Sequence, residues 1–531
     1  MMNSVENNKG GSGVFRPFAS MPLSVKLFLL VIIALIPRII VFLQPQIITI
    51  DGTLYVKMAK LFSEGRYEGI PRIYFSLYPL MIFLVQKIVG DWELSGQLIS
   101  LILGAFSTIP IFLLGRSLYN GRIGWLSALF YVTLPDFLKF DTQVVRDPTY
   151  WFFMAFSLYL VWEGLKKNRL PLMGLASISA GLGAITRVEG FILWGVLALY
   201  VAFCRTPRIP IKRKALNVAI LIIIFPILFS PILLSTKRDT SHIAVGEMAS
   251  FSINMIEQNM RAILRPGDPI ARINTEDYKS LPPLTKDALE LGSRHRLILG
   301  VFEVIYKFIK SANLLIVLIF LGLWKRKREG FESPDWYLLY VFAALFIMSV
   351  FYARQIYYFS TRHGLTLVLA SLFFAGHGLG FIVEIVSREL NRFSSGWTMI
   401  KRYPLHLLTI FFIMIFLAQG ISFKGTDKFI QKEIGLWLKD KGYKGSVIMG
   451  PKSLLRLAFY LDGKFLEMPD SWEKAMESIR KNEVRIVAID SCTIEEDSTG
   501  FLGNRPGSGL SLLQEVKQKN EGCSIQIYQV Q

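Results

Sequence analysis

Charged residues and cysteines are scarce in this sequence. Only 19% of its 531 residues are Asp, Glu, Lys or Arg, whereas 52% are hydrophobic. A water-soluble enzyme of ordinary composition carries more charge and fewer apolar residues. The three cysteines form no CxxC pair and no metal-ligand cluster, so zinc binding and redox chemistry have no support. The composition indicates a polytopic membrane protein.

The distribution of basic residues argues against nucleic-acid binding. The net charge is +19, yet Lys and Arg fall in short clusters between apolar runs rather than on one soluble face. Such spacing is typical of the positive-inside rule, by which cytoplasmic loops collect basic residues. The charge therefore reports membrane topology.

Apolar runs predict eleven membrane spans. The first, Pro22–Leu43, is long enough to cross a hydrocarbon core that needs about 20 residues, and it is longer than a signal-peptide core. We interpret it as an uncleaved anchor that follows a mobile, Gly/Ser-rich tail over residues 1–21. The further predicted spans are Leu94–Leu118, Arg122–Leu138, Thr149–Leu165, Leu172–Ile185, Gly190–Phe203, Ala215–Leu234, Leu297–Trp324, Trp336–Tyr352, Leu365–Val386 and Leu405–Ile421.

The stretch Ser76–Gly90 decides the predicted topology. It is apolar but shorter than a span and begins beside a Tyr-Pro pair, so we expect an interfacial or re-entrant helix. If it does not cross, the later basic clusters, such as Arg205–Lys214, all fall on the cytoplasmic side together with the N-terminus. The outer face then receives the loops 44–94 and 235–296 and the chain after the last span.

The C-terminal segment has the composition of a soluble domain. After Lys424, "SVIMG", "KFLEM" and "VRIVAID" predict strands, while "SLLRLAFYL" and "SWEKAMESIRKN" predict helices. This alternation predicts a small α/β domain with a partly parallel sheet. Cys492 and Cys523 either pair there or stay as buried thiols. The predicted parts are the tail 1–21, a transmembrane domain 22–421 and an extracytoplasmic domain 422–531, in a prokaryotic plasma (inner) membrane.

Ionisable residues gather on the predicted outer face. Charges at the ends of membrane helices are costly to bury, so they face water, pair with each other or meet a ligand. A site of carboxylates and arginines suits a substrate that carries phosphate. The residues are Asp51, Arg146, Asp147, Arg187, Glu189, Arg362 and His363.

Each of these residues also has a structural interpretation. Asp51 and Asp147 both stand where a helix begins, which suits a helix cap. Arg187 and Glu189 are close enough in sequence to pair within a tight turn. His363 fits a structural role better than a catalytic one. The convergence of the set, rather than any single member, favours a functional site.

Several short motifs occur in a characteristic order. Arg38 closes the first span, "DGTLYVKMAKLFSEG" follows it, "YPLMIFLVQKIVGDWE" leads into the second span, "GLGAITRVEGFIL" joins two later spans and "STRHGLTLVLA" follows a large outer loop. This order resembles the polyprenyl-phosphate-dependent GT-C glycosyltransferases, in the subgroup of protein O-mannosyltransferases and bacterial lipid A aminoarabinose transferases (glycosyltransferase family 39-like). The resemblance covers about residues 25–420. It implies a GT-C transmembrane domain of about eleven helices.

The resemblance assigns roles where residues match. The family's catalytic aspartate after the first span matches Asp51, its second outer aspartate matches Asp147, and the basic residue of its Thr-Lys/Arg-x-x-Gly-like turn matches Arg187. Gly52 stands where the family often has a second carboxylate. "SLYP" at 76–79 replaces the Glu-Lys-Pro whose lysine contacts the donor phosphate in aminoarabinose transferases, which argues against that donor. The Trp-Trp-Asp motif of oligosaccharyltransferases is absent from the sequence, which argues against that branch.

The residue types fit sugar transfer from a polyprenyl phosphate to a hydroxyl of a lipid, glycan or protein. The reaction needs a base, for which Asp51 is the candidate, with Asp147 as the second catalytic carboxylate. A single base opposite the leaving group implies inversion, and fixed cations stabilise the departing phosphate. The candidate phosphate ligands are Arg72, Arg146, Arg187 and Arg362, and the candidate substrate ligands are Tyr55, Glu189, Tyr357, Tyr358 and His363. For Tyr357 and Tyr358 the aromatic belt is the alternative.

Two other classes stay open. One is a polytopic transporter or lipid flippase, although such proteins place ionisable residues at mid-membrane in paired halves. The other is an inactive GT-C-like assembly subunit, which Gly52 after Asp51 would suit. The sequence does not identify the sugar, the lipid carrier or the acceptor. It contains no dedicated metal-ligand cluster, and it leaves a divalent metal requirement and the oligomeric state undecided.

Overall fold

The chain divides into two compact units in the computed structural model. The helical unit comprises residues 1–41, 58–142 and 146–421, and the mixed unit comprises residues 42–57, 143–145 and 422–531. Residues that the structure describes are 21–65, 77–204, 209–235, 257, 291–292, 294–356, 359–392, 403–422, 426–469, 472–491, 509–517 and 524–531.

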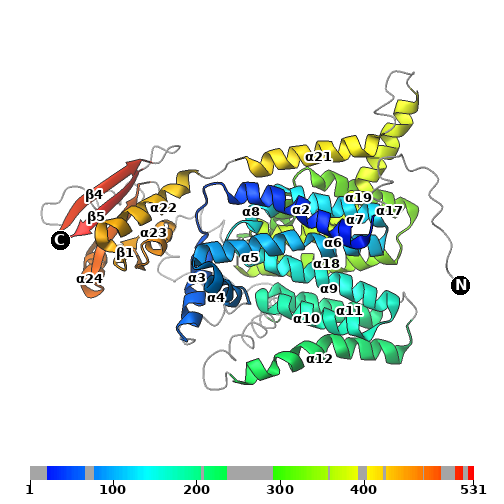
Figure 1. The fold of residues 1–531 in the computed structure, drawn as a ribbon, viewed down its shortest axis with the longest axis horizontal. Coiled ribbons are helices and arrows are strands. Elements are labelled where there is room, and N and C mark those ends of the chain that lie inside the picture. The colour runs from blue at the N-terminus through cyan, green and yellow to red at the C-terminus, as the bar shows by residue number, and fades with distance from the viewer. Residues whose placement is uncertain are drawn as a thin grey trace. The chain divides into compact units, whose positions relative to one another are not determined.

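Apolar helices build the helical unit, since a membrane-spanning segment must satisfy its backbone groups internally. α10 packs against its neighbours α9, α11 and α12 (Figure 1). The helices are α2 (Leu23–Phe42), α4 (Leu77–Val89), α5 (Trp92–Phe106), α6 (Thr108–Leu118), α7 (Gly121–Thr133), α8 (Pro135–Asp141), α9 (Asp147–Lys167), α10 (Leu170–Thr186), α11 (Glu189–Phe203), α12 (Ile211–Ser235), α16 (Arg296–Ala312), α17 (Leu315–Glu329), α18 (Ser333–Ile356), α19 (Thr361–Arg392) and α21 (Pro404–Ile421).

Five helical segments among the described residues are long and apolar enough to cross a membrane. The bent pair α16–α17 raises this number to six if the pair is one span. The prediction of a polytopic α-helical membrane protein is confirmed, while the count of eleven spans stays a prediction. The five segments are Leu23–Phe42, Trp92–Leu118, Ser333–Gln355, Thr361–Leu390 and Pro404–Ile421.

Small residues bring two of these helices into direct backbone contact. A Cβ added at Gly322 in α17 would lie 1.8 Å from the Phe374 carbonyl oxygen in α19, and one at Gly378 would lie 1.9 Å from the Leu318 carbonyl oxygen. Membrane helices pack closely in this way because lipid supplies no hydrophobic drive for their association. The two glycines therefore fix the spacing between α17 and α19.

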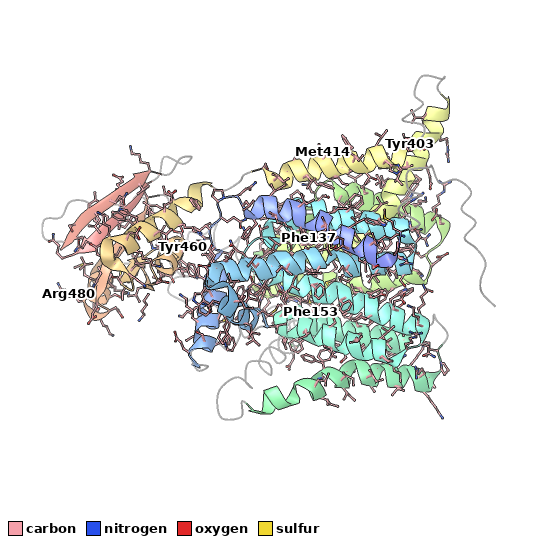
Figure 2. All side chains as sticks on the ribbon, in the orientation of Figure 1. Phe137, Phe153, Tyr403, Met414, Tyr460 and Arg480 are labelled. Atoms are coloured by element: carbon pink, nitrogen blue, oxygen red, sulfur yellow. The ribbon has the colours of Figure 1, made fainter. Side chains whose placement is uncertain are left out.

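Aromatic side chains fill the interior of the helical unit. Phe137 of α8, which Figure 2 labels, and Trp151 of α9 are both fully buried. Their rings meet edge to face with centroids 4.9 Å apart. Such pairs stabilise beyond the apolar area that they bury. This contact anchors α8 beside the start of α9.

Two of the predicted apolar segments form a short helix and a bent pair of helices. The apolar stretch at Ser76–Gly90 forms α4, a helix of 13 residues, which agrees with a segment shorter than a span. The run Leu297–Trp324 is not one straight helix: α16 and α17 meet at 105°. Asn313, with φ 53°, ends α16 at this break. Hydropathy alone averages over such a break, because both halves are apolar.

Within its described residues, the mixed unit contains a five-stranded sheet of order β2-β1-β3-β5-β4. β1 pairs in parallel with β2 and β3, and β5 pairs antiparallel with β3 and β4. α22 and α23 share one buried apolar cluster with the sheet, and α24 contributes to another. The elements are α22 (Thr426–Leu438), β1 (Val447–Gly450), α23 (Leu455–Tyr460), β2 (Lys464–Glu467), α24 (Trp472–Lys481), β3 (Val484–Asp490), β4 (Leu510–Lys517) and β5 (Ser524–Val530).

The predicted α/β domain is confirmed, with its three predicted strands and two predicted helices in place. β4 and β5 were not predicted from the sequence. The apolar residues of β4 do not alternate cleanly with polar ones, and its pairing with β5 shifts register between Leu512 and Gln514. The mixed unit also takes in residues from the predicted first outer loop, since the division between the units falls inside α3 (Ile50–Ser63).

Candidate functional site

Arg187 is the centre of a buried charge cluster in the helical unit. Its Nη1 donates a hydrogen bond to Asp147 Oδ1. Its Nη2 and Nε donate to the two carboxylate oxygens of Glu189, at 2.6 and 3.2 Å. Paired N–H···O bonds of this kind fix a guanidinium plane as well as its charge. Arg187 is therefore a rigid cation between two carboxylates.

Two residues at the start of α19 complete the cluster. Arg362 Nη1 lies 3.5 Å from the second oxygen of Asp147. His363 Nε2 lies 3.3 Å from Glu189 Oε1, and its ring is close to those of Tyr352 and Phe359, with centroids 4.9 and 5.1 Å away. The cluster thus joins residues from three separate stretches of the chain.

Helix ends explain why these residues stand where they do. Asp147 and Glu189 are the first residues of α9 and α11, where the positive end of the helix dipole favours a carboxylate. Arg187 follows the last residue of α10, where the dipole favours a cation. Three helix ends therefore support the charges that meet there.

Burial makes the pairing essential. Asp147 has no exposed surface, and Arg187 and Glu189 are 5% and 8% exposed. A charge so far from water is stable only with partners. A small cavity borders the cluster, and its lining includes Glu189, His363, Ser349 and Thr366. Arg187 and Arg362 do not line this cavity; they lie in the cluster itself, where they are paired with the carboxylates.

The structural roles expected for the cluster residues hold for the pair Arg187 and Glu189 but not for Asp147 as a helix cap. The carboxylate of Asp147 faces the two arginines, and no side-chain cap bond occurs at the start of α9. Arg187 and Glu189 do pair across their turn, as that interpretation expected, and Arg187 also binds Asp147. Their proposed roles in catalysis stay predictions.

Asp51 belongs to the mixed unit, so it falls in the other unit from the charge cluster. It lies in the first turn of α3, and the capping bond there comes from another residue: Thr49 Oγ1 accepts from the Gly52 amide at 2.8 Å. Tyr55, one turn further along, is 3% exposed. Thr49 thus provides a helix cap at the start of α3, a role for which the sequence had suggested Asp51.

The remaining candidates fall at the edge of this site or outside it. Arg146 directly precedes Asp147 and is half-buried. Arg72, Tyr357 and Tyr358 lie outside the described residues, as do Cys492 and Cys523, most of the loop 235–296 and the tail 1–20. Among the residues that the structure describes, no group of three or more His, Cys, Asp or Glu could hold a metal ion.

Arg38 and Asp141 form a second buried ion pair, which was not predicted from the sequence. Arg38 in α2 and Asp141 at the end of α8 have no exposed surface, and Arg38 Nη2 and Nε lie 2.5 and 2.9 Å from Asp141 Oδ2. The Tyr131 hydroxyl donates to the same oxygen at 3.4 Å. An arginine inside an apolar run needs an acidic partner, and this requirement could have prompted a search for Asp141.

Comparison with known proteins identifies the class. Residues 76–234 match the model of the dolichyl-phosphate-mannose-protein mannosyltransferase family. ArnT from Cupriavidus metallidurans has a similar structure, with a TM-score of 0.59 and 13% identity over 95% of this chain and 98% of that chain. An oligosaccharyltransferase from Archaeoglobus fulgidus has a TM-score of 0.56 and 12% identity over 87% of this chain and 67% of its own. No curated protein sequence matches this chain.

The fold is therefore that of the GT-C glycosyltransferases, as the order of motifs predicted. The matched family region contains Asp147, Arg187 and Glu189 of the charge cluster. One structure of ArnT contains undecaprenyl phosphate, and one of the archaeal oligosaccharyltransferase AglB contains dolichol-phosphate and an inhibitory peptide. The chain is an integral membrane protein of glycosyltransferase type.

Proposed function

We propose that this protein is an inverting glycosyltransferase that moves a sugar from a polyprenyl-phosphate donor to an acceptor hydroxyl on the outer face of a prokaryotic plasma membrane. The observation that carries the proposal is the buried cluster of Arg187 and Arg362 with Asp147. Fixed cations in a poorly solvated place suit a lipid-linked phosphate. Undecaprenyl phosphate and dolichol-phosphate in the two similar structures support this class of donor.

The two arginines take different parts in the proposed reaction. Arg187 is held by two carboxylates and supplies a fixed positive field. Arg362 makes the longer contact, and its side chain is 21% exposed, so it is the more accessible of the two to a donor phosphate. Asp147 sets their spacing. The phosphate leaves with its negative charge matched by cations already in position, which lowers the barrier.

Asp51 is the proposed base. As the acceptor oxygen bonds to the anomeric carbon, the bond from that carbon to the phosphate oxygen breaks, and the acceptor proton passes to the Asp51 carboxylate. The family position that Asp51 matches supports this assignment. A base of this kind contributes about 100-fold or more to the rate.

The test is sugar transfer from labelled polyprenyl-phosphate sugars by membranes that contain the wild type, Asp51→Asn or Asp440→Asn, at matched expression. Asp440 is an exposed carboxylate of the same unit and serves as the control. We expect Asp51→Asn to lose about 100-fold in transfer rate while it still binds donor, and Asp440→Asn to match the wild type. Undiminished transfer by Asp51→Asn would refute Asp51 as the base. Transport of the labelled lipid without transfer by the wild type would support the flippase alternative.

A further inference from the structure

A helix of the C-terminal domain forms two hydrogen bonds with the backbone just before Asp51. Arg456 Nε in α23 donates a hydrogen bond to the Ile48 carbonyl at 2.8 Å. The Ile48 amide donates to the Tyr460 hydroxyl at 2.9 Å. Arg456 and Tyr460 are four positions apart and so share one face of α23. Together they satisfy both backbone groups of one residue, and all these residues belong to the mixed unit.

Both side chains of this clamp are firmly placed. Tyr460 is 6% exposed, and Lys432 Nζ lies 5.1 Å from the centre of its ring. A Cβ added at Gly435 in α22 would lie 2.7 Å from the Tyr460 Cβ, so α22 packs directly against this residue. Burial lowers the pKa of the Arg456 guanidinium. A partly buried cation of this kind needs an acceptor, and the Ile48 carbonyl provides it.

Further hydrogen bonds fix the chain from Ile48 into the first turn of α3. Thr49 Oγ1 donates to the Val144 carbonyl at 3.0 Å and accepts from the Gly52 amide at 2.8 Å. A Cβ at Gly52 would lie 2.8 Å from the Val144 carbonyl oxygen and 2.8 Å from Thr49 Oγ1. The packing therefore explains why glycine replaces the second carboxylate that the family often has there. Asp51 lies between two positions whose backbone is fixed.

We propose that the C-terminal domain positions the catalytic carboxylate, with Arg456 and Tyr460 as positioning residues for Asp51. The inference rests on the proposed function, because it requires Asp51 to act as the base. Rate depends steeply on the placement of reacting groups, so a loosened Asp51 slows proton transfer more than it weakens donor binding. The domain is then part of the transfer machinery rather than an appendage.

Four variants of the full-length protein test the clamp. Tyr460→Phe removes only the hydroxyl that accepts from Ile48, and Arg456→Met removes the donor but keeps an apolar side chain. Tyr443→Phe is the matched control, since the Tyr443 hydroxyl binds Gln529 elsewhere in the same unit at 2.9 Å. Arg480→Met is the second control, because Arg480 is exposed at the end of α24 (Figure 2).

Two measurements on each purified variant give the outcome. Hydrogen–deuterium exchange of peptides over residues 44–56 reports the hold on Ile48, and transfer kinetics report its consequence. We expect Tyr460→Phe and Arg456→Met to speed exchange and to lower kcat about fivefold, the equivalent of one lost hydrogen bond, with KM for the donor changed less than about twofold. The controls should match the wild type in both measurements.

The same experiment separates two kinds of failure. A wild type that transfers sugar, with clamp variants that match their controls in exchange or in kcat, would overturn this inference alone. A wild type that transfers no sugar, or an Asp51→Asn variant with full activity, would overturn the proposed function and this inference with it. A fall in kcat with faster exchange at residues 44–56 supports both.

Discussion

At the scale of single residues, the charge cluster contains two arginines with unequal surroundings. Arg187 is bound by Asp147 and Glu189 and is 5% exposed as a residue. Arg362 touches Asp147 at 3.5 Å. Substitution of Arg187 leaves two buried carboxylates without their main partner, which is strongly destabilising. Arg362 is therefore the better probe of phosphate binding.

We expect Arg362→Gln to raise the KM for donor at least about tenfold, because a charge-assisted bond to phosphate contributes about 1.5–3 kcal/mol. Arg362→Lys should retain part of the affinity, since it keeps the charge but loses the fork of N–H donors. The measurement is initial transfer rate against donor concentration. Equal KM values for the wild type and both variants would remove Arg362 from the donor site.

Sequence reasoning identified charged residues at helix ends but not their partners. Asp147 and Arg187 were both singled out, because a carboxylate before an apolar run and a basic residue in a turn are visible locally. The pair Arg38–Asp141 was missed, since its members are 103 positions apart and nothing local links them. The role of Thr49 was missed for another reason: the choice of cap depends on backbone geometry, and Asp51 was the more obvious candidate.

At the scale of elements, α16 holds the segment that carries Arg362 and His363. Glu303 Oε1 accepts a hydrogen bond from the Phe359 amide at 3.0 Å. Ser311 Oγ donates to the Thr361 carbonyl at 3.0 Å, and both α16 residues thereby bind the chain at the start of α19. The 105° bend between α16 and α17 lets α16 reach this position.

Glu303→Ala should loosen the start of α19 and lower transfer about fivefold, because the Phe359 amide loses its acceptor. Glu303→Gln is the matched control, since its side-chain carbonyl can still accept that bond. Transfer rates at saturating and at limiting donor give the comparison. If both substitutions lower the rate equally, the charge of Glu303 rather than its hydrogen bond is what matters, and this account of α16 is wrong.

Predictability of the elements followed the strength of their hydrophobic pattern. The span predicted at Pro22–Leu43 is α2, and Thr149–Leu165 lies within α9. The break between α16 and α17 was not predicted, because hydropathy does not show where the axis of an apolar helix changes direction. β4 was not predicted because its apolar and polar residues do not alternate regularly, and its pairing shifts register between Leu512 and Gln514. Helices that follow from the hydrophobic pattern of their own segment could be predicted. Features that depend on contacts between elements could not.

At the scale of the whole molecule, the basic clusters predict an N-terminus in the cytoplasm and a C-terminal domain outside. A reporter fused after Gln531, active only in the extracytoplasmic compartment, should therefore be active. The same reporter inserted between Lys327 and Arg328 should be inactive, because that cluster is predicted to be cytoplasmic. An inactive C-terminal fusion would change the number of crossings and separate the C-terminal domain from the proposed reaction.

The charge cluster also constrains how the protein is made. Asp147 is synthesised 40 residues before Arg187 and 215 residues before Arg362. Asp147 is thus made long before Arg362, and a buried carboxylate without its full set of partners is costly. The charge cluster is complete only after α19, which begins at Thr361, has been made. Translation order therefore makes the charge cluster one of the last parts of the helical unit to be completed.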